Sequence, residues 1–428
     1  MPRTRIFEAR ELATGVTLLH HRASKWKTET VRFVFVDRPD HRVAARAVGA
    51  HLLRHGHRRC RGLESVSRFF RQQYGGGVDS HVAIGSTRHL LTVRTNVVGG
   101  RHLPGRPDTL GRAMGFVAKV LREPWFAAPS FDVSIFERER ANLLRAIDAV
   151  REDKSRWADQ RLREEMFAGT PLAIPAHGRR EDVEAVTLDE VRAALEATVS
   201  EAPILIYSVG ERDIDSVAEA VMPALGEVER PALRVKKPAV PPLRTRPRVV
   251  SEVEDIAQAR LAMGFRVRDW DPKTDVHAAL FGDILLGGGS TSKLFKEIRE
   301  KRSLAYSIWS SLDGAPGALV VSAGVDPAHL GRVQSLVRRQ IAAVAEGRIS
   351  AEELESARAG IAKSLAGTWD SPEAMVQFDL AARLGRRRER SPEALLARYE
   401  KVGVDDAAAI FRRLELDTVY RLGPEKRS

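Results

Sequence analysis

A proline-rich stretch near the middle of the chain divides it into two parts of similar length. Residues 223–247 hold six prolines among basic residues: Pro223, Pro231, Pro238, Pro241, Pro242 and Pro247. Proline fixes φ and cannot donate a backbone hydrogen bond, so such a stretch is typical of an extended, semi-rigid linker. The sequence therefore predicts an N-terminal domain at 1–222, a linker at 223–247 and a C-terminal domain at 248–428.

The predicted elements follow a similar order on the two sides of this linker. The first part predicts strands at 14–22 and 29–37, a helix at 41–58, a short helix at 63–74, a hairpin at 78–97, helices at 109–122, 130–152, 155–167 and 188–198, and a buried strand at 201–210. The second part predicts a strand at 260–267, helices at 274–286 and 291–300, a hairpin, helices at 327–346, 351–369, 372–385, 392–400 and 404–413, and a strand at 417–423. We therefore expect a tandem of two α+β units.

Two histidines one helical turn apart are the first candidates for chemistry. The stretch VGAHLLRHGHRRCRG, residues 48–62, places His51 and His55 at positions i and i+4, with His57 just beyond. On a helix this spacing puts both imidazoles on one face, where they could ligate one zinc ion. Arg54 stands where the H-x-x-E-H motif of zinc hydrolases has its glutamate. The pattern thus offers two metal ligands and lacks the general base.

Charge and cysteine content bear on partners and compartment. A net charge of +12 could indicate nucleic acid or another acidic partner. However, the basic residues are scattered among 57 acidic ones and no aromatic-interleaved basic motif occurs, which argues against nucleic-acid binding. The single cysteine, Cys60, fits a free thiol in a reducing compartment. The chain start MPRTRIFEAR lacks an apolar segment, so we expect a cytoplasmic protein without a signal peptide or membrane span.

The chain resembles the pitrilysin/insulinase-like metallopeptidases, the inverzincins. The stretch GGGSTSKLFKEIREKRSLAYSIWSS, residues 287–311, is similar to the family's glycine turn, S-[KR]-LF helix, R-E-K and LAY sequence. The first part matches by its H-x-x-x-H pattern, its glycine turn at 75–77 and its long helix at 130–152. The resemblance implies the LuxS/processing-peptidase-like fold of a half-size bacterial member: two homologous domains, each a mostly antiparallel sheet covered by helices.

The resemblance also identifies what the zinc site has lost. In the family, two histidines and a glutamate from the long helix bind zinc, and these positions match His51, His55 and Ala146. Zinc catalysis needs three protein ligands, and alanine cannot ligate. The guanidinium of Arg54 repels a dication and cannot accept a proton from water. We therefore expect no bound metal, no cofactor and no catalytic residue in this chain.

Three other side chains could complete a metal site in principle. They are His57, the long-helix residue Glu139, which matches the family's earlier glutamate, and Asp148. On a regular helix His57 would face away from His55, since residues two apart do not share a face. An active zinc metalloendopeptidase with an atypical site therefore remains an alternative interpretation.

The second part of the chain keeps a pair that the resemblance connects with substrate. In the family, an arginine and a tyrosine of the C-terminal part bind the substrate backbone and the oxyanion, and they match Arg299 and Tyr306. A guanidinium and a phenol are suitable donors to a developing negative oxygen. The resemblance therefore assigns a substrate-binding role to both residues.

One hypothesis accounts for both parts. Some half-size members work as unequal pairs, in which one subunit holds zinc and the other supplies the Arg/Tyr pair; residues 148–173 are similar to such zinc-less partners. We expect a non-catalytic subunit that acts on a peptide or protein substrate together with a zinc-bearing homologue or a second copy of this chain. The alternatives are the atypical peptidase and a peptide- or protein-binding module without proteolysis.

Overall fold

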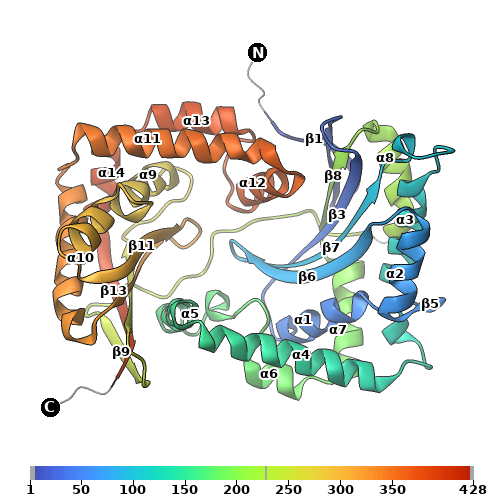
Figure 1. Ribbon diagram of the computed structural model, residues 1–428, viewed down its shortest axis with the longest axis horizontal. Helices are drawn as coiled ribbons and strands as arrows, with labels where there is room; N and C mark the ends of the chain where they lie inside the picture. The colour runs from blue at the N-terminus through green and yellow to red at the C-terminus, as the bar shows by residue number, and fades with distance from the viewer. Residues whose placement is uncertain (1–4, 227–228, 425–428) are drawn as a thin grey trace. The chain divides into compact units, whose positions relative to one another are not determined.

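The computed structural model describes residues 5–226 and 229–424, which form two compact units (Figure 1). The N-terminal unit contains Arg5–Asp148 and Pro175–Arg234, and the C-terminal unit contains Ala149–Ile174 and the chain from Val235 onward. Of the predicted linker 223–247, residues 223 and 224 lie in a 3-10 turn, Met222–Ala224, and residues 229–247 form neither helix nor strand. No helix within the described residues is both long enough and apolar enough to cross a membrane.

The N-terminal unit is one six-stranded sheet with helices packed on it. Its strands, in spatial order, are β1 (Glu8–Ala13), β2 (Val16–Arg22), β8 (Ile204–Gly210), β3 (Thr28–Asp37), β7 (Arg88–Val98) and β6 (Gly77–Gly85). Its helices include α1 (Val43–Leu53), α2 (Gly62–Gln72), α3 (Thr109–Arg122), α4 (Val133–Glu152), α6 (Arg180–Ala185), α7 (Leu188–Glu201) and α8 (Ile214–Val221). The strands β4 (Gly56–His57) and β5 (Cys60–Arg61) form a separate small ribbon.

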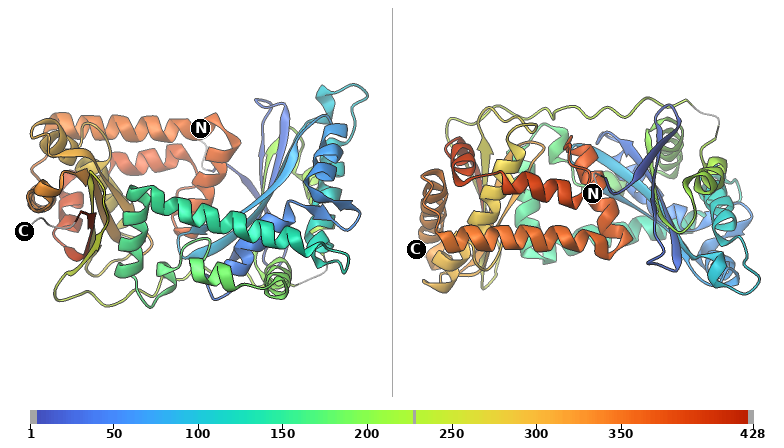
Figure 2. Two further views of the ribbon diagram at one scale, coloured as in Figure 1. Left: turned by 60° about the horizontal axis from the view of Figure 1, so that its bottom comes forward. Right: turned by 90° about the horizontal axis from the view of Figure 1, so that it is seen from above.

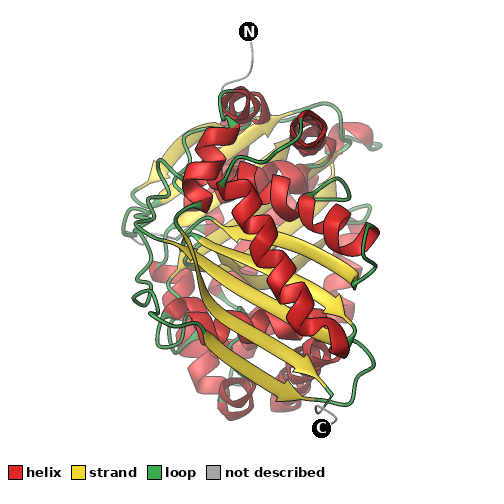
Figure 3. Ribbon diagram, turned by 90° about the vertical axis from the view of Figure 1, so that its left-hand side faces the viewer, coloured by secondary structure: helices red, strands yellow, loops and turns green. Residues whose placement is uncertain are grey.

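The C-terminal unit has a five-stranded sheet and its own helices (Figure 3). Its strands, in spatial order, are β11 (Ala305–Asp313), β12 (Ala318–Val325), β10 (Ala259–Val267), β13 (Leu414–Gly423) and β9 (Arg248–Val253). Its helices include α5 (Lys154–Met166), α9 (Val276–Gly287), α10 (Leu330–Ala345), α11 (Ala351–Ala366), α12 (Pro372–Leu384), α13 (Pro392–Glu400) and α14 (Val404–Phe411).

The two sheets share one topology. In the order β6-β7-β3-β8-β2, the first three neighbouring pairs are antiparallel and the last is parallel. In the order β11-β12-β10-β13-β9, the same sequence of pairings recurs. The predicted fold, a tandem of two units with mostly antiparallel sheets covered by helices, is therefore confirmed.

Helix α1 of the N-terminal unit corresponds to helix α9 of the C-terminal unit. Each contains a glycine packed closely against a helix of its own unit, and these two glycines align the two sequences. A Cβ added to Gly49 of α1 would lie 2.6 Å from Leu195 of α7, and one added to Gly282 of α9 would lie 2.3 Å from Phe411 of α14. Each glycine thus permits its helix to approach the helix that precedes the last strand of its unit. The pairing aligns Gly49 with Gly282.

A hydrogen bond from the edge strand of each sheet gives the same alignment, at the residue that follows each glycine. Ser80 of β6 donates to the carbonyl of Ala50, and Ser310 of β11 donates to the carbonyl of Asp283 across 3.2 Å. With Ala50 matched to Asp283, the residues at the positions of His51 and His55 are Ile284 and Gly288. The histidine pair is therefore a feature of the N-terminal unit alone.

The segment Ala149–Ile174, which contains α5, packs with the C-terminal sheet. In the predicted domains these residues belong to the N-terminal domain. The helix α5 lies beside β10 and β13 (Figure 2). Its residues Ala158 and Leu162 form a buried cluster with Ala262, Tyr420 and Leu422 of these strands. On β10, Gly264 leaves room for the helix, since a Cβ there would lie 2.5 Å from Met166. The helix α5 thus forms part of the C-terminal unit's core.

Two predicted helices differ from those in the structure. The helix predicted at 41–58 ends at Leu53, because Gly56 takes a left-handed conformation with φ 87° and the chain then enters β4. The helix predicted at 291–300 contains a π-helical turn at Phe295–Glu300, in which the Lys301 amide donates to the carbonyl five residues back, that of Lys296, across 2.9 Å.

Candidate functional site

The histidine pair lies at the end of α1. His51 is in the last turn of the helix, whereas His55 follows the helix, with its amide bonded to the Leu52 carbonyl at 3.0 Å. The helix end is held from the other side as well, since the Gly62 amide donates to the His55 carbonyl at 2.9 Å. The two imidazoles therefore share one side of the structure although they do not share one helix.

Glu139 of α4 contacts both histidines from the facing helix. Its carboxylate lies 3.0 Å from Nε2 of His55 and 3.5 Å from Nδ1 of His51. Asn142, one turn along α4, donates to the other carboxylate oxygen of Glu139 across 3.2 Å. The residue that the sequence matched to the family's earlier glutamate therefore forms a hydrogen bond with His55 and lies beside His51.

Arg54 adds a positive charge to this cluster of three side chains. Its Nη2 donates to Nδ1 of His51 across 3.0 Å and lies 3.9 Å from the Glu139 carboxylate. A nitrogen lone pair that accepts this hydrogen bond is not free to bind a metal ion. The positive charge of Arg54 instead lies beside the carboxylate, which is where a bound cation would be attracted.

The protonation states follow from burial and from these neighbours. Burial lowers the pKa of His51, and the nearby positive charge of Arg54 lowers it further. Burial likewise lowers the pKa of His55, against the opposing effect of Glu139. Burial alone would raise the pKa of Glu139, but hydrogen bonds from His55 and Asn142 outweigh it and hold the pKa below its ordinary value. At neutral pH we therefore assign neutral imidazoles around a charged carboxylate.

The donor set does not fit the zinc ion that the family resemblance implies. Ala146, which the resemblance matched to the third ligand position, is exposed and offers no ligand. Asp148 forms an ion pair with Arg180 at 2.9 Å, and the ring of His57 packs edge-on against Phe116. Within residues 5–226 and 229–424, His51, His55 and Glu139 do meet, but they contact one another directly and are not arranged as three ligands around one ion. Of the side chains that could complete a site, only Glu139 contacts the histidines, and Arg54 occupies part of that contact.

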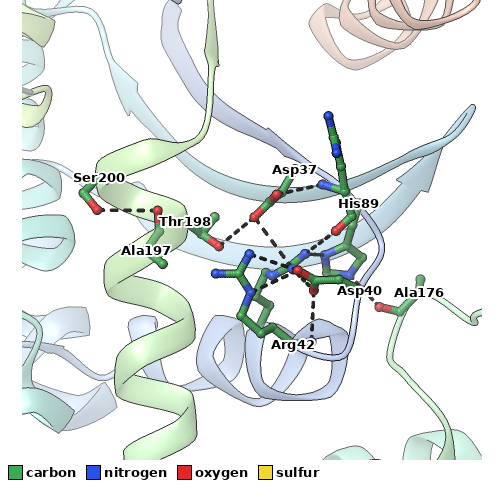
Figure 4. Close-up of polar contacts among 10 residues, drawn as sticks. Asp37, Asp40, Arg42, His89, Ala176, Ala197, Thr198 and Ser200 are labelled. Carbon is green, nitrogen blue, oxygen red and sulfur yellow. Dashed lines mark hydrogen bonds and ion pairs between the residues drawn. The ribbon is translucent and has the colours of Figure 1, made fainter. Parts of the chain in front are cut away.

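A buried ionic cluster holds the beginning of α1. Arg46, which is fully buried, forms ion pairs with Asp40 and Asp37 and donates to Nδ1 of His89 across 3.0 Å. His89 in turn bonds through Nε2 to the Ala176 carbonyl at 2.8 Å (Figure 4). Burial lowers the pKa of His89 to about 4, so the ring is neutral and donates to this carbonyl. The cluster ties residues 175–178 to α1.

That tie brings a histidine that sequence reasoning missed to the site. His177 follows Ala176, and its charge, when present, would lower the pKa of His51. Burial lowers the pKa of His177 itself. No spacing rule connects residue 177 with residue 51, because the two come together only through the packing of the segment after Pro175 on α1.

Arg299 lies on the π-helical turn of the C-terminal unit. Its side chain is exposed, and its guanidinium carbon stands 4.7 Å from the centre of the Phe295 ring. No carboxylate in the described part of the chain forms an ion pair with it. π-turns place extra residues in a helix and occur often at functional positions, so the guanidinium is displayed on an unusual turn with its donors free.

Tyr306 lies on a β-bulge at the start of the edge strand β11. Ala305 pairs with Val325 and Ser307 pairs with Gly324, which leaves Tyr306 as the extra residue. Its side chain is 58% exposed, far more than is usual for a tyrosine, and its hydroxyl has no hydrogen-bond partner among the residues the structure describes. A bulge redirects a side chain, and here it directs a phenol into solvent.

The structure places these two residues on adjoining elements. The Leu304 amide donates to the Ile298 carbonyl at 3.0 Å and the Ser303 amide donates to the Arg299 carbonyl at 3.1 Å. These bonds fix the short connection between the π-turn and β11. The predicted site residues therefore fall into two groups, one in each unit: the histidines with Glu139 and Arg54, and Arg299 with Tyr306.

Comparisons with known proteins agree with the family resemblance. The family model described as "Peptidase M16 inactive domain" matches residues 185–361. A Bacillus subtilis protein named "Probable inactive metalloprotease YmfF" is 26% identical over 95% of this chain and 96% of its own length. An uncharacterized zinc protease of Mycobacterium tuberculosis is 28% identical over 78% of this chain and 75% of its own length. A conserved protein of Enterococcus faecalis of known structure has a TM-score of 0.90 at 22% identity and covers 99% of this chain and 100% of its own, which supports the fold.

Proposed function

Because this chain is a peptidase-like member of the M16, or pitrilysin/insulinase-like, family, we propose that it is a non-catalytic subunit that pairs with a zinc-bearing homologue. In this pair the homologue cleaves the substrate. This chain contributes Arg299 and Tyr306 to the binding of a peptide or protein.

The observation that carries the proposal is the hydrogen bond from Arg54 to His51. It withdraws one histidine lone pair and places a permanent positive charge beside Glu139. The chain also has alanine at position 146, which the family resemblance matches to the third zinc ligand. A metal-activated water needs three protein ligands and an open coordination position. A chain with these side chains is therefore suited to contribute to a peptidase as a partner.

The C-terminal unit supports the binding part of the proposal. Both Arg299 and Tyr306 are exposed, and both hold their donors free of partners in the described residues. A carbonyl oxygen of an extended peptide could accept from either donor, and charge that develops on that oxygen would strengthen the hydrogen bond. Neither residue contributes to the core, so packing does not account for them.

The location of the pair is also part of the proposal. Cys60 is the chain's one cysteine and is a free thiol, which fits a reducing compartment such as the cytoplasm.

The test is reconstitution with a zinc-bearing homologue from the same source organism. The chain alone should not hydrolyse a quenched fluorogenic peptide library with added zinc, whereas the mixture should. Arg299→Ala or Tyr306→Phe in this chain should lower kcat/KM of the mixture about tenfold or more. Arg338→Ala and Tyr74→Phe, which change exposed residues of the same types, should leave it unchanged.

Each part of the proposal can fail separately. Zinc-dependent hydrolysis by the isolated chain would make it an enzyme in its own right. Full activity of the Arg299 and Tyr306 variants in the mixture would remove their assigned roles. Homologue activity that is the same with and without this chain would exclude the pairing.

A further inference from the structure

A pocket among the helices of the N-terminal unit has a surplus of arginine. Its volume is about 470 Å³, and its walls come from the ends of α1 and α3, from α7 and from the segment after α8. The ionisable residues that line it are Arg58, Arg122, Arg192, Arg230 and Glu196. Much of the remaining wall is apolar and includes Leu121, Phe126, Leu195 and Leu225. Its size is within the range of pockets that bind small organic molecules.

Arg230 supplies a buried positive charge to this pocket. Its side chain is 3% exposed and donates to the Ala202 carbonyl at 2.9 Å and to the Leu225 carbonyl at 3.4 Å, while its Nε has no partner. Burial lowers its pKa. The Ala202 carbonyl ends α7 and carries partial negative charge, but no described carboxylate forms an ion pair with Arg230. A guanidinium buried without a countercharge is costly and favours an anion nearby.

Two further arginines lie at the pocket with no described ion pair. Arg58 and Arg122 are exposed, and their guanidinium groups have no hydrogen-bond partner within residues 5–226 and 229–424. Arg192 is partly engaged, with Asp189 at 2.9 Å and the Phe126 carbonyl at 3.0 Å. The lining therefore has four positive groups against the one carboxylate of Glu196.

The walls are joined to one another by hydrogen bonds. The Arg58 amide donates to the Glu123 carbonyl at 3.1 Å, and His57 forms an isolated β-bridge with Pro124. The bond from Arg192 to Phe126 joins α7 to the segment that follows α3. The walls from α3, α7 and the segment after α1 are thus held together before a ligand arrives, so little binding free energy would be lost in organising them.

We propose that this pocket binds an organic anion in which a carboxylate joins an apolar body. The carboxylate would accept charge-assisted hydrogen bonds from the free arginines, and the body would cover the leucine and phenylalanine side chains. Such a molecule could be a fatty acid or the free carboxyl end of a hydrophobic peptide. The site is separate from Arg299 and Tyr306, and it does not depend on the pairing with a homologue.

The proposal can be tested by calorimetric titration of the full chain. Decanoate and an acetylated tri-leucine peptide with a free carboxyl end should bind, whereas decanamide and the amidated peptide should bind at least about tenfold more weakly. Preference for decanoate over the free peptide would identify a lipid source, and the reverse preference would identify a chain end.

A charge-matched pair of variants separates the pocket from the general basic character of the protein. Arg58→Ser with Arg122→Ser should weaken binding of the acid about tenfold or more, because it removes two guanidinium donors to the carboxylate. Both positions are exposed, so the fold does not depend on them. Arg59→Ser with Arg71→Ser, two exposed arginines outside the pocket, should leave it unchanged. Equal binding of acid and amide, equal loss in both double variants, or no binding of either acid would overturn the proposal.

Discussion

His55 and Glu139 are joined by a hydrogen bond of 3.0 Å between side chains that are both almost completely buried. This bond connects the end of α1 to α4 across 84 residues of chain. The bond between His55 and Glu139 thus serves as a structural link between two helices.

Replacement of Glu139 should therefore lower stability without any metal being involved. Glu139→Gln removes the charge that faces Arg54 and weakens the bond from His55, and we expect a loss of about 1–3 kcal/mol in the free energy of unfolding in urea. Glu137→Gln on the same helix breaks only an exposed ion pair with Arg140 and should cost less than about 1 kcal/mol. Equal losses in the two variants would contradict the link.

The metal content should depend on Arg54 and Ala146. The purified chain, dialysed against zinc and then against buffer, should retain far less than one zinc per chain by elemental analysis. Arg54→Glu with Ala146→Glu removes the guanidinium and adds a third ligand, so zinc uptake should approach one per chain. Arg54→Ala alone serves as the control, because it removes the guanidinium and keeps His51, His55 and Glu139 but adds no carboxylate at position 146. Stoichiometric zinc in the unaltered chain would contradict the assignment.

The close packing of α9 should make Gly282 sensitive to a single methyl group. Gly282→Ala places a Cβ 2.3 Å from the ring of Phe411, and we expect destabilisation of about 1–3 kcal/mol. Gly360→Ala on α11 meets nothing within 4 Å and should stabilise by about 0.5–1 kcal/mol. Chemical denaturation of both variants compares a crowded glycine with an open one, and the same sign for both would refute the packing argument.

The pH dependence of stability should carry a signature of Asp283. Burial raises the pKa of this carboxyl to about 6, against hydrogen bonds from Ser310 and Leu312. Since the folded pKa exceeds the unfolded value of about 3.9, its contribution is present below pH 4 and is lost as pH rises through 6. The stability difference between the unaltered chain and Asp283→Asn should fall by on the order of 2 kcal/mol from pH 4 to pH 8. A difference that is flat over this range would show that Asp283 does not titrate there.

The Arg299 and Tyr306 side chains should matter little for folding. Arg299→Ala and Tyr306→Ala remove exposed groups, and each should change the free energy of unfolding by less than about 0.5 kcal/mol. Ile298→Ala, next to Arg299 and fully buried, should cost about 2–5 kcal/mol. A large loss in the free energy of unfolding of Arg299→Ala or Tyr306→Ala would show that the side chain stabilises the fold.

Periodicity predicted the elements that carry a strong apolar pattern and missed those without one. The predicted strand at 29–37 is β3, Thr28–Asp37, in which every side chain from Val31 to Val36 is buried. The edge strand β1 was not predicted, since its sequence EARELA is exposed on both faces and has no alternation. The edge strand β9 was not predicted either, because exposed Val249 and Val253 follow a run of prolines.

The candidate site was predictable only in its local part. The expected loss of the general base and of the third ligand rests on Arg54 and Ala146 as residue types, read through the family resemblance, and it stays a prediction. The hydrogen bonds from Arg54 to His51 and from His55 to Glu139 depend on tertiary packing, and no local rule gives them. The early end of α1 had a signal, since a glycine two residues after Arg54 is the usual mark of a helix terminus. The π-turn at Arg299 had no signal of this kind.

The packing of α5 on the C-terminal sheet has a consequence for how the protein is made. The ribosome releases residues 154–166 well before it has synthesised β10, which begins at Ala259, and long before β13, which begins at Leu414. Until then the apolar face with Ala158, Leu162 and Met166 has no sheet to cover it. The apolar face of residues 154–166 therefore stays exposed until the strands of the C-terminal sheet have been synthesised. We expect a chaperone to bind the nascent chain at this face.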